Sequence, residues 1–325
     1  MRLRPLGSTG LTVSPVGLGL AALGRPAYID LGRDADLGAD RGVEALERRC
    51  HQVLDAAFGA GVRYLDAARS YGRAEAFLAS WLRSRHRDPA EVTVGSKWGY
   101  TYVGDWRMDA DVHEVKDHSL AALTRQLAES RALLGPHLDL YQVHSATLDS
   151  GILEDRSVLD ELTRLRDSGV VVGLSSSGPG QADTIRRALE LTEAGKAPFA
   201  SVQATWNLLE PSAGPALAEA GAAGWGVIVK EAVANGRLTP HGQAADALAR
   251  VAARHAVGVD AVALAAVLAN PWVDVVLSGA VTPAQVEDNL AAVQVELDGG
   301  ELEELATLAE PPERYWQERS ALAWS

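Results

Sequence analysis

VVVGL (residues 170–174) and VDVVL (residues 273–277) carry apolar side chains at nearly every position instead of at every second position. Strands that are buried on both faces, as in parallel sheets, have this continuous pattern, whereas half-exposed strands alternate. Short runs of similar composition recur along the whole chain. Eight of them can be read in order, at residues 13–19, 62–66, 92–97, 138–143, 170–175, 200–204, 226–230 and 273–278. The sequence therefore predicts a mainly parallel sheet of eight strands.

Helical patterns separate most of these runs. In two of the connecting segments, apolar residues recur at helical spacing, first at Leu46, Val53, Leu54, Ala57 and Phe58 and then at Phe77, Leu78, Trp81 and Leu82. Eight strand-helix units are typical of the (β/α)8 TIM barrel, which needs about 250 residues. For a chain of 325 residues, we predict an α/β fold of this kind with additional segments.

Three segments lie outside the eight units. Residues 1–13 are typical of a β-hairpin that caps one end of the barrel, residues 25–42 of a long loop, and the tail beyond Leu302 of an extra C-terminal helical segment. No linker rich in Pro, Ser or Gly divides the chain, so we expect a single domain over residues 1–325. The alternative is an open doubly wound sheet, but the glycines near residue 17 miss the G-x-G-x-x-G spacing that usually accompanies it.

Composition disfavours several classes of protein. A formal net charge of −13 at pH 7 argues against a nucleic-acid partner, because phosphate binding depends on basic clusters. No apolar stretch approaches the roughly 20 residues that span a membrane, and no apolar signal segment follows Met1, so we expect a cytoplasmic protein without membrane contact. The single cysteine, Cys50, can form neither an intramolecular disulfide nor a cysteine metal cluster, and we predict no metal site.

Polar side chains follow several of the predicted strands. Asp66, Lys97 and His144 each stand at or directly after the end of a strand, and Tyr71 lies five positions beyond Asp66. In a (β/α)8 barrel the carboxyl ends of the strands form the active site. We therefore expect these four side chains to meet there.

Together the four groups can perform acid-base chemistry on a carbonyl. A tyrosine has an ordinary pKa near 10, and a neighbouring ammonium lowers that pKa because it stabilises the phenolate. We expect Lys97 to supply the ammonium, Asp66 to keep Lys97 charged and oriented, and His144 to orient the substrate carbonyl by a hydrogen bond. Tyr71 is then the predicted proton donor. The structural alternative is an ion pair at the barrel rim beside a packed tyrosine.

Over nearly its whole length the chain resembles the aldo/keto reductases, NAD(P)-dependent barrel enzymes that interconvert carbonyls and alcohols. RPLGSTGLTVSPVGLG (residues 4–19) is similar to the opening hairpin and first strand of that family, and SGAVTPAQVEDNLAA (residues 278–292) to its last crossover. YLDAARSYG, GSKWG and LYQVHS follow the family's order and spacing for a catalytic Asp, Tyr, Lys and His. The resemblance implies that a hydride passes between nicotinamide and the carbonyl carbon while Tyr71 gives or takes the proton.

The resemblance also implies a groove for NADPH or NADH. Family members hold the nicotinamide carboxamide with polar residues that correspond to Ser175, Ser176 and Gln203, although Ser176 stands where Asn is usual. Lys230 stands where the family commonly has a tyrosine that stacks on the nicotinamide. From their positions, Lys230 and Arg237 are candidates for contacts with the cofactor pyrophosphate. The alternative is that Lys230 pairs with the adjacent Glu231 or with solvent.

Aromatic residues near the strand ends are candidates for the substrate pocket. Because Lys230 cannot stack as a flat ring does, Trp98 or Trp206 is predicted to stack instead and to line the pocket. Other aromatic side chains in the long loops and the tail are further candidates, namely Tyr28, Tyr100, Trp106 and Trp316.

The last crossover predicts a helix start, with Thr282 as N-cap, Pro283 at the first position and Gln285 closing a capping box. A helix N-terminus attracts anions. By resemblance the adenosine end of the cofactor lies here, near Gln285 and Asn289. Members that prefer NADPH usually have a basic residue in place of Thr282, so the sequence leaves NADPH and NADH both open. The full predicted groove consists of Gly19, Ser175, Ser176, Gln203, Lys230, Arg237, Gly279, Thr282, Gln285 and Asn289.

The sequence alone is compatible with three functions. The first is an NAD(P)-dependent oxidoreductase that interconverts a small-molecule carbonyl and an alcohol, and the second is an NAD-linked sugar or alcohol dehydrogenase of the same fold. The third is a cofactor-binding redox sensor or regulatory barrel with little turnover. We favour the first, because all four catalytic residue types are present, and we expect a monomer or a small homo-oligomer.

Overall fold

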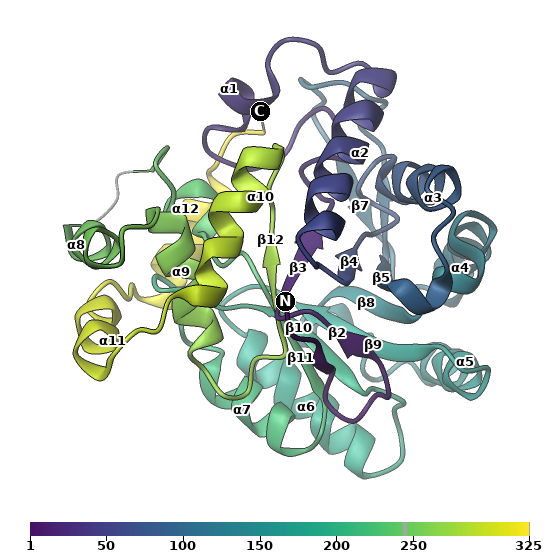
Figure 1. Ribbon diagram of the computed structural model, residues 1–325. Coiled ribbons are helices and arrows are strands. Elements are labelled where there is room, and N and C mark those ends of the chain that lie inside the picture. The colour runs from purple at the N-terminus through teal and green to yellow at the C-terminus, as the bar shows by residue number, and fades with distance from the viewer. Residues whose placement is uncertain (243–245, 325) are drawn as a thin grey trace.

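In the computed structural model, which describes residues 1–242 and 246–324, eight parallel strands close into a barrel. The strands follow one another around the ring in chain order, and the last of them pairs with the first (Figure 1). They are β3 (Val16–Gly19), β4 (Tyr64–Asp66), β5 (Thr93–Trp98), β8 (Leu140–Ala146), β9 (Val171–Ser176), β10 (Ser201–Thr205), β11 (Gly226–Lys230) and β12 (Val275–Ser278). The predicted (β/α)8 TIM barrel is confirmed. The open doubly wound sheet is wrong, because an open sheet would leave β3 and β12 unpaired with each other.

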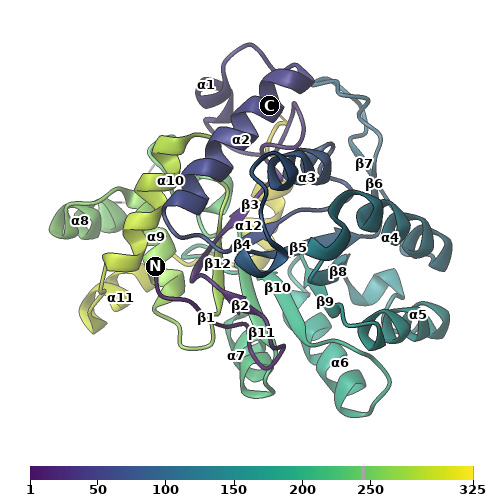
Figure 2. The ribbon, with the colours of Figure 1, turned by 45° about the vertical axis from the view of Figure 1, so that its right-hand side comes forward.

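A ring of helices covers the outside of the barrel (Figure 2). The helices that connect consecutive strands include α2 (Val43–Gly59), α3 (Ala74–Ser84), α4 (Leu120–Leu134), α5 (Arg156–Asp167), α6 (Gln181–Glu193), α7 (Gly214–Ala222), α8 (Asp246–His255) and α9 (Val259–Leu268). After β12 comes α10 (Pro283–Leu290). The buried residues of α2 and α3 include Leu46, Val53, Leu54, Ala57, Phe77, Leu78, Trp81 and Leu82, as their spacing predicts.

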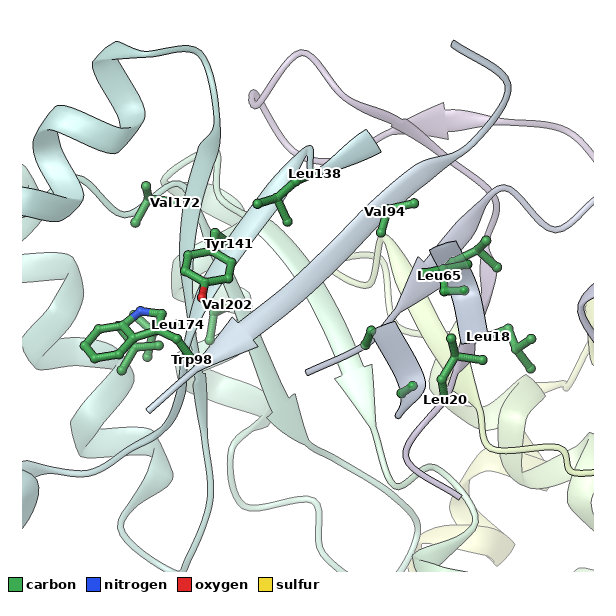
Figure 3. Packing of buried hydrophobic residues seen from close by; sticks show 14 of the residues in the cluster. Leu18, Leu20, Leu65, Val94, Trp98, Leu138, Tyr141, Val172, Leu174 and Val202 are labelled. Atoms are coloured by element: carbon green, nitrogen blue, oxygen red, sulfur yellow. The ribbon is translucent and has the colours of Figure 1, made fainter. Parts of the chain in front are cut away.

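The largest hydrophobic cluster lies between the barrel strands and the surrounding helices. Figure 3 shows part of it, with Leu65 of β4, Val94 of β5 and Leu174 of β9 among the buried side chains. Every residue of β5 is buried, and so is every residue of β9 except Val171. Burial on both faces explains why the strand sequences are continuously apolar instead of alternating.

Among the described residues, no single helix is both long enough and apolar enough to cross a lipid bilayer. The pair α8 and α9 meets that criterion only when the two are taken together, across a bend of 88°.

The N-terminal hairpin, β1 (Arg4–Pro5) with β2 (Thr12–Val13), covers the end of the barrel at which the strands begin. Leu6, between the two strands, is fully buried. It packs so closely on the first residue of β11 that a Cβ at Gly226 would lie 2.5 Å from Leu6 Cγ. The hairpin cap predicted from the sequence is therefore confirmed, and the opposite end of the barrel is left for loops.

Three further segments extend the fold. They are the long loop after β3 with α1 (Arg33–Leu37), the antiparallel pair β6 (Tyr100–Tyr102) and β7 (Glu114–Lys116), and the tail with α11 (Gly299–Ala306) and α12 (Pro312–Ser320). In both views the yellow chain end lies near the α1 segment, and the ring of Trp324 meets that of Tyr28 edge-on at 6.4 Å. The C-terminal helical segment is confirmed, whereas the β6–β7 pair was not predicted.

The hairpin cap contributes to stability mainly through Leu6. We predict that Leu6→Ala lowers the free energy of unfolding by about 3 kcal/mol, because it leaves a cavity under the barrel. Denaturant titration followed by circular dichroism measures this change. Leu3→Ala is the matched control, since Leu3 is 43% exposed and its truncation should change stability by less than about 0.5 kcal/mol. Equal effects of the two substitutions would contradict the role given to Leu6.

Candidate active site

Asp66, Lys97 and Tyr71 meet at the carboxyl ends of β4 and β5. Lys97 Nζ donates a hydrogen bond to Asp66 Oδ1, a second to the Ala67 carbonyl oxygen at 2.9 Å, and a third to the Tyr71 hydroxyl at 3.4 Å. Asp66 and Lys97 are each only 1% exposed. A buried ion pair of this kind is maintained only when hydrogen bonds satisfy both partners, and three donors of one ammonium are used here.

His144, at the end of β8, completes the group. Its ring meets the ring of Tyr71 edge-on, with centroids 5.4 Å apart. Ser70 Oγ lies 3.3 Å from His144 Nδ1. When the Ser70 hydroxyl donates to Nδ1, the imidazole proton resides on Nε2 and is available as a hydrogen-bond donor.

The protonation states follow from burial. Burial raises the pKa of the Tyr71 phenol well above its ordinary value, the charge of Asp66 adds to the rise, and Arg25 opposes it. Burial also lowers the pKa of Lys97, although Asp66 acts in the other direction. Burial lowers the pKa of His144 well below its usual range, and the charges of Lys97 and Lys230 lower it further.

These directions correct one expectation. The sequence suggested that Lys97 lowers the pKa of Tyr71, and in this structure the pKa is raised. The reason is that Asp66 compensates the charge of Lys97 while burial penalises the phenolate. At neutral pH the phenol of Tyr71 is therefore protonated, and the imidazole of His144 is uncharged.

A cavity of about 300 Å³ opens beside these side chains. Asp66, Tyr71 and His144 line it together with the predicted groove residues Gly19, Gln203, Lys230 and Gly279. Gln203 Nε2 donates to Asp66 Oδ2 at 2.8 Å, so that β10 supports the ion pair from across the barrel. The cavity thus joins the predicted acid-base group to part of the predicted cofactor groove.

Ser175 and Ser176, at the end of β9, are both fully buried. Ser175 Oγ accepts a hydrogen bond from the backbone N–H of Ser145 at 2.8 Å. Ser176 Oγ has no hydrogen-bond partner in the described part of the chain. Neither of these two residues lines the cavity, although the neighbouring Ser177 does.

Lys230 and Arg237 have different surroundings. Lys230 Nζ donates to Thr205 Oγ1 at 2.7 Å, and burial lowers the pKa of Lys230 to about 8 against the influence of Glu231. The guanidinium of Arg237 is bound to the tail instead, with Nη1 and Nη2 at 3.1 and 2.5 Å from the carboxylate oxygens of Glu310. The prediction that Arg237 faces the cofactor groove is not supported, because its guanidinium is committed to this pair.

A second cavity shares Gly279 with the first and is lined by the predicted groove residues Thr282, Gln285 and Asn289. Thr282 is the N-cap of α10, and its Oγ1 accepts from the backbone N–H of Gln285 at 3.2 Å. The predicted capping box is wrong in one detail: Gln285 Oε1 accepts from the N–H of Val281, one residue before the N-cap. Asn289 Nδ2 donates to Ser278 Oγ at 2.8 Å.

Trp98 and Trp206 are not among the residues that line the first cavity, contrary to prediction. Trp98 is fully buried in the large hydrophobic cluster (Figure 3) and meets the ring of His118 edge-on. Successive side chains of a strand point to opposite faces, so that Lys97 faces the site and Trp98 the helices. Trp206 packs edge-on against Trp272.

The aromatic lining comes from loops instead. Tyr28 of the long loop, Tyr100 of β6 and Trp324 of the tail line the cavity, and Arg25 lies among them. Tyr28 and Tyr100 were candidates from their residue type alone, whereas Arg25 and Trp324 were missed. No sequence motif near Arg25 or Trp324 predicts a site, because these residues reach the cavity only through the course of the long loop and of the tail.

The comparisons with known proteins point to one family. The model of the Aldo/keto reductase family matches residues 38–310. An uncharacterized oxidoreductase of Bacillus subtilis, YqkF, is 29% identical over 184 residues, which are 55% of this chain and 50% of that protein. The NADH-specific methylglyoxal reductase of Escherichia coli is 25% identical over 97% of this chain and 100% of its own length.

A solved structure shows the same fold. The holo form of an aldo-keto reductase from Bacillus halodurans superposes with a TM-score of 0.70 at 23% identity, over 96% of this chain and 97% of that one. By contrast, the chain spans about half the length of the first curated relatives that it matches.

Acid-base side chains beside a cavity at the strand ends of a (β/α)8 barrel define an enzyme-type site. The family match covers most of the chain, and this protein belongs to the aldo/keto reductase family. The resemblance read from the sequence is thereby confirmed.

Glu231 fixes the C-terminal tail to the site. Its carboxylate accepts two hydrogen bonds from Arg319 Nε, at 3.0 and 2.9 Å, and lies 3.8 Å from Lys230 Nζ. Burial acts to raise the pKa of Glu231, but Arg319 and Lys230 outweigh it and hold the pKa at about 2.

We predict that Glu231→Gln lowers the free energy of unfolding by about 3 kcal/mol at pH 7, because it leaves Arg319 without its buried partner. The folded-state pKa of Glu231 lies below its ordinary value of 4.5, so the stabilisation is present above about pH 4.5 and is lost toward pH 2. In denaturant titrations, the difference in free energy of unfolding between the unmodified protein and Glu231→Gln should shrink as the pH falls from about 4.5 toward 2. Glu313→Gln, at an exposed position of α12, is the control. A pH-independent difference would show that the charge of Glu231 is not the cause.

Proposed function

We propose that this chain catalyses the NAD(P)-dependent interconversion of a carbonyl and an alcohol, with Tyr71 as general acid and base. The observation that carries the proposal is the hydroxyl of Tyr71, 3.4 Å from Lys97 Nζ, at the wall of a cavity that His144 also lines. The names of the curated relatives support the reaction class, since a methylglyoxal reductase acts on a carbonyl.

Each side chain has a role that follows from its surroundings. The neutral Tyr71 phenol donates its proton to the carbonyl oxygen during reduction, and Lys97 stabilises the phenolate through the hydrogen bond between Nζ and the hydroxyl. Asp66 holds Lys97 in place and favours the charged form of its ammonium. The Nε2–H of His144 donates to the same carbonyl oxygen and orients it. The bound nicotinamide supplies or accepts the hydride.

The residues fit a dinucleotide. The two cavities are neighbours, because Asp30, Val233 and Gly279 line both of them. The far cavity contains the N-terminus of α10 at Thr282, where backbone N–H groups favour an anion. At the near end, Gln203 and Ser177 line the cavity, whereas Ser176 does not, although its Oγ has no partner among the described residues. Gln203 and Ser177 would hold the nicotinamide carboxamide.

The charge of the far cavity favours NADH over NADPH. Four acids line it, namely Asp30, Asp36, Asp260 and Asp288. Of the basic side chains that line it, His241 lies 3.5 Å from Asp36, and Arg33 donates to the backbone carbonyl oxygens of Ala22, Arg25 and Pro26. A 2′-phosphate is recognised by positive charge. This acidic lining supports NADH as the preferred cofactor.

The role of Tyr71 is tested by Tyr71→Phe. We predict a loss of kcat of at least about 10³-fold, because the proton donor is removed, with an unchanged dissociation constant for the reduced cofactor measured by fluorescence titration. Tyr102→Phe is the matched control, since it removes a phenol outside this cavity and should leave kcat unchanged. A Tyr71→Phe enzyme with near-normal turnover would refute the assignment.

The cofactor preference is tested by equilibrium binding. We predict that NADH binds at least about tenfold more tightly than NADPH, a difference of about 1.4 kcal/mol. Asp36→Asn should reduce the ratio several-fold, because Asp36 accepts from Gln285 Nε2 at 2.7 Å and lies at the cavity wall. Asp40→Asn, in the same loop but exposed, should leave the ratio unchanged. Tighter binding of NADPH by the unmodified protein would overturn the preference.

A further inference from the structure

Arg25 is a buried cation in the wall of the cavity, next to the proposed proton donor. It is 2% exposed and lines the cavity with Tyr71 and His144. Its Nη1 donates to Glu114 Oε1 at 2.5 Å and to the carbonyl oxygen of Ser70 at 3.2 Å. These two contacts fix one nitrogen of the guanidinium between β7 and the residue that precedes Tyr71.

Aromatic rings fix the rest of the guanidinium. Its central carbon lies 5.0 Å from the ring centroid of Tyr28, 5.4 Å from that of Tyr71 and 4.8 Å from that of Trp324. The Trp324 ring is itself stacked on His113, with centroids 4.1 Å apart and planes 10° apart. Contacts of this kind stabilise a cation and restrict its orientation. The position of Arg25 is therefore set before any substrate binds.

Two of the three guanidinium nitrogens are unused. No residue in the described part of the chain accepts a hydrogen bond from Nε or Nη2 of Arg25, and Nε is buried without a partner. Buried donors without acceptors are costly, and an arginine fork matches the two oxygens of a carboxylate. A pre-positioned arginine with unused donors beside a reaction cavity indicates a site for an acceptor group of the ligand.

The charge balance of the cavity indicates which acceptor. Three ion pairs account for most of its charges, namely Asp66 with Lys97, Glu114 with Arg25, and Glu231 with Arg319. Lys230 adds a positive charge that shares Glu231 with Arg319. Asp30 also lines the cavity, and burial raises its pKa to about 7, although the charge of Arg33 acts against that rise. The cavity therefore accommodates a negative group better than a positive one.

Building on the function proposed above, we propose that Arg25 binds a carboxylate of the substrate, so that the preferred substrates are short oxo-acids with an aldehyde or ketone group. The carbonyl oxygen accepts from Tyr71 and His144, and the carboxylate accepts from Nη2 of Arg25. A cavity of about 300 Å³ is suited to a short aliphatic chain. Glu114 and the three rings act on the substrate only through Arg25, as positioning residues.

The test compares acids with neutral aldehydes of equal chain length. The probes are glyoxylate, 4-oxobutanoate and 5-oxopentanoate against acetaldehyde, butanal and pentanal, each with NADH. We expect at least one acid to exceed its neutral counterpart by about tenfold or more in kcat/KM, mainly through KM, as for a charge-assisted hydrogen bond. In Arg25→Gln this ratio should fall to near one. Arg73→Gln, which removes an exposed positive charge outside the cavity, should retain the ratio of the unmodified protein.

A ratio at or below one for every pair in the unmodified protein, or a ratio retained in Arg25→Gln, overturns the proposal. Where Arg25→Gln does not fold, Arg25→Lys keeps the charge without the planar fork and should lower the ratio in part. Calorimetric titration with pentanoate and with pentanamide provides a readout that does not require turnover. If pentanoate binds more tightly than pentanamide and this preference is lost on substitution of Arg25, carboxylate recognition is supported, even when no probe is turned over. The absence of turnover with every probe would refute the proposed reaction, and not the recognition of a carboxylate. Equal binding of the two probes overturns the inference.

Discussion

The buried pair of Asp66 and Lys97 is the interaction on which the site depends. The two residues end neighbouring strands, because Asp66 is in register with Gly95 of β5 and Lys97 stands two positions further along the same face. Gln203 reaches the second carboxylate oxygen from β10, which is possible only in a closed sheet. Barrel closure, the burial of the two charges and their hydrogen bonds therefore form one structural unit. Without it, neither the hydroxyl of Tyr71 nor the ammonium of Lys97 would have a fixed position.

A similar balance of charge recurs around the cavity. Arg319 and Glu231 connect α12 to the end of β11, and Arg25 with Glu114 connects the loop after β3 to β7. Glu231 has a φ of 58°, an uncommon conformation for a residue with a side chain, and such strain is found mostly where the surrounding structure enforces it. The cavity is consequently walled by segments that are far apart in the sequence, and paired charges hold these segments together. This arrangement permits several ionised groups to surround the cavity at limited cost in free energy.

The sequence predicted the barrel well, because a strand buried on both faces and an amphipathic helix each have a clear period. It also predicted which residues would gather at the strand ends, since the order of Asp66, Lys97 and His144 along the chain fixes their order around the ring. Its failures have physical causes. Trp98 was assigned to the pocket although it neighbours Lys97 in a strand and must face the opposite side. Arg237 was assigned to the groove from its place in the loop after β11, and its pairing with Glu310, 73 residues away, leaves no local pattern in the sequence that could have excluded this. Arg25 and Trp324 were missed for the same reason, because long loops carry them to the cavity.

The dependence of turnover on one Asp66–Lys97 unit is tested most directly by a double-mutant cycle. Asp66→Asn, Lys97→Met and the double variant are compared with the unmodified protein in kcat for carbonyl reduction, with circular dichroism as a check of the fold. If the two side chains act only as a pair, the double variant should lose no more activity than the worse single variant, within about threefold. Losses that multiply would show that Asp66 and Lys97 act independently, and would contradict the account.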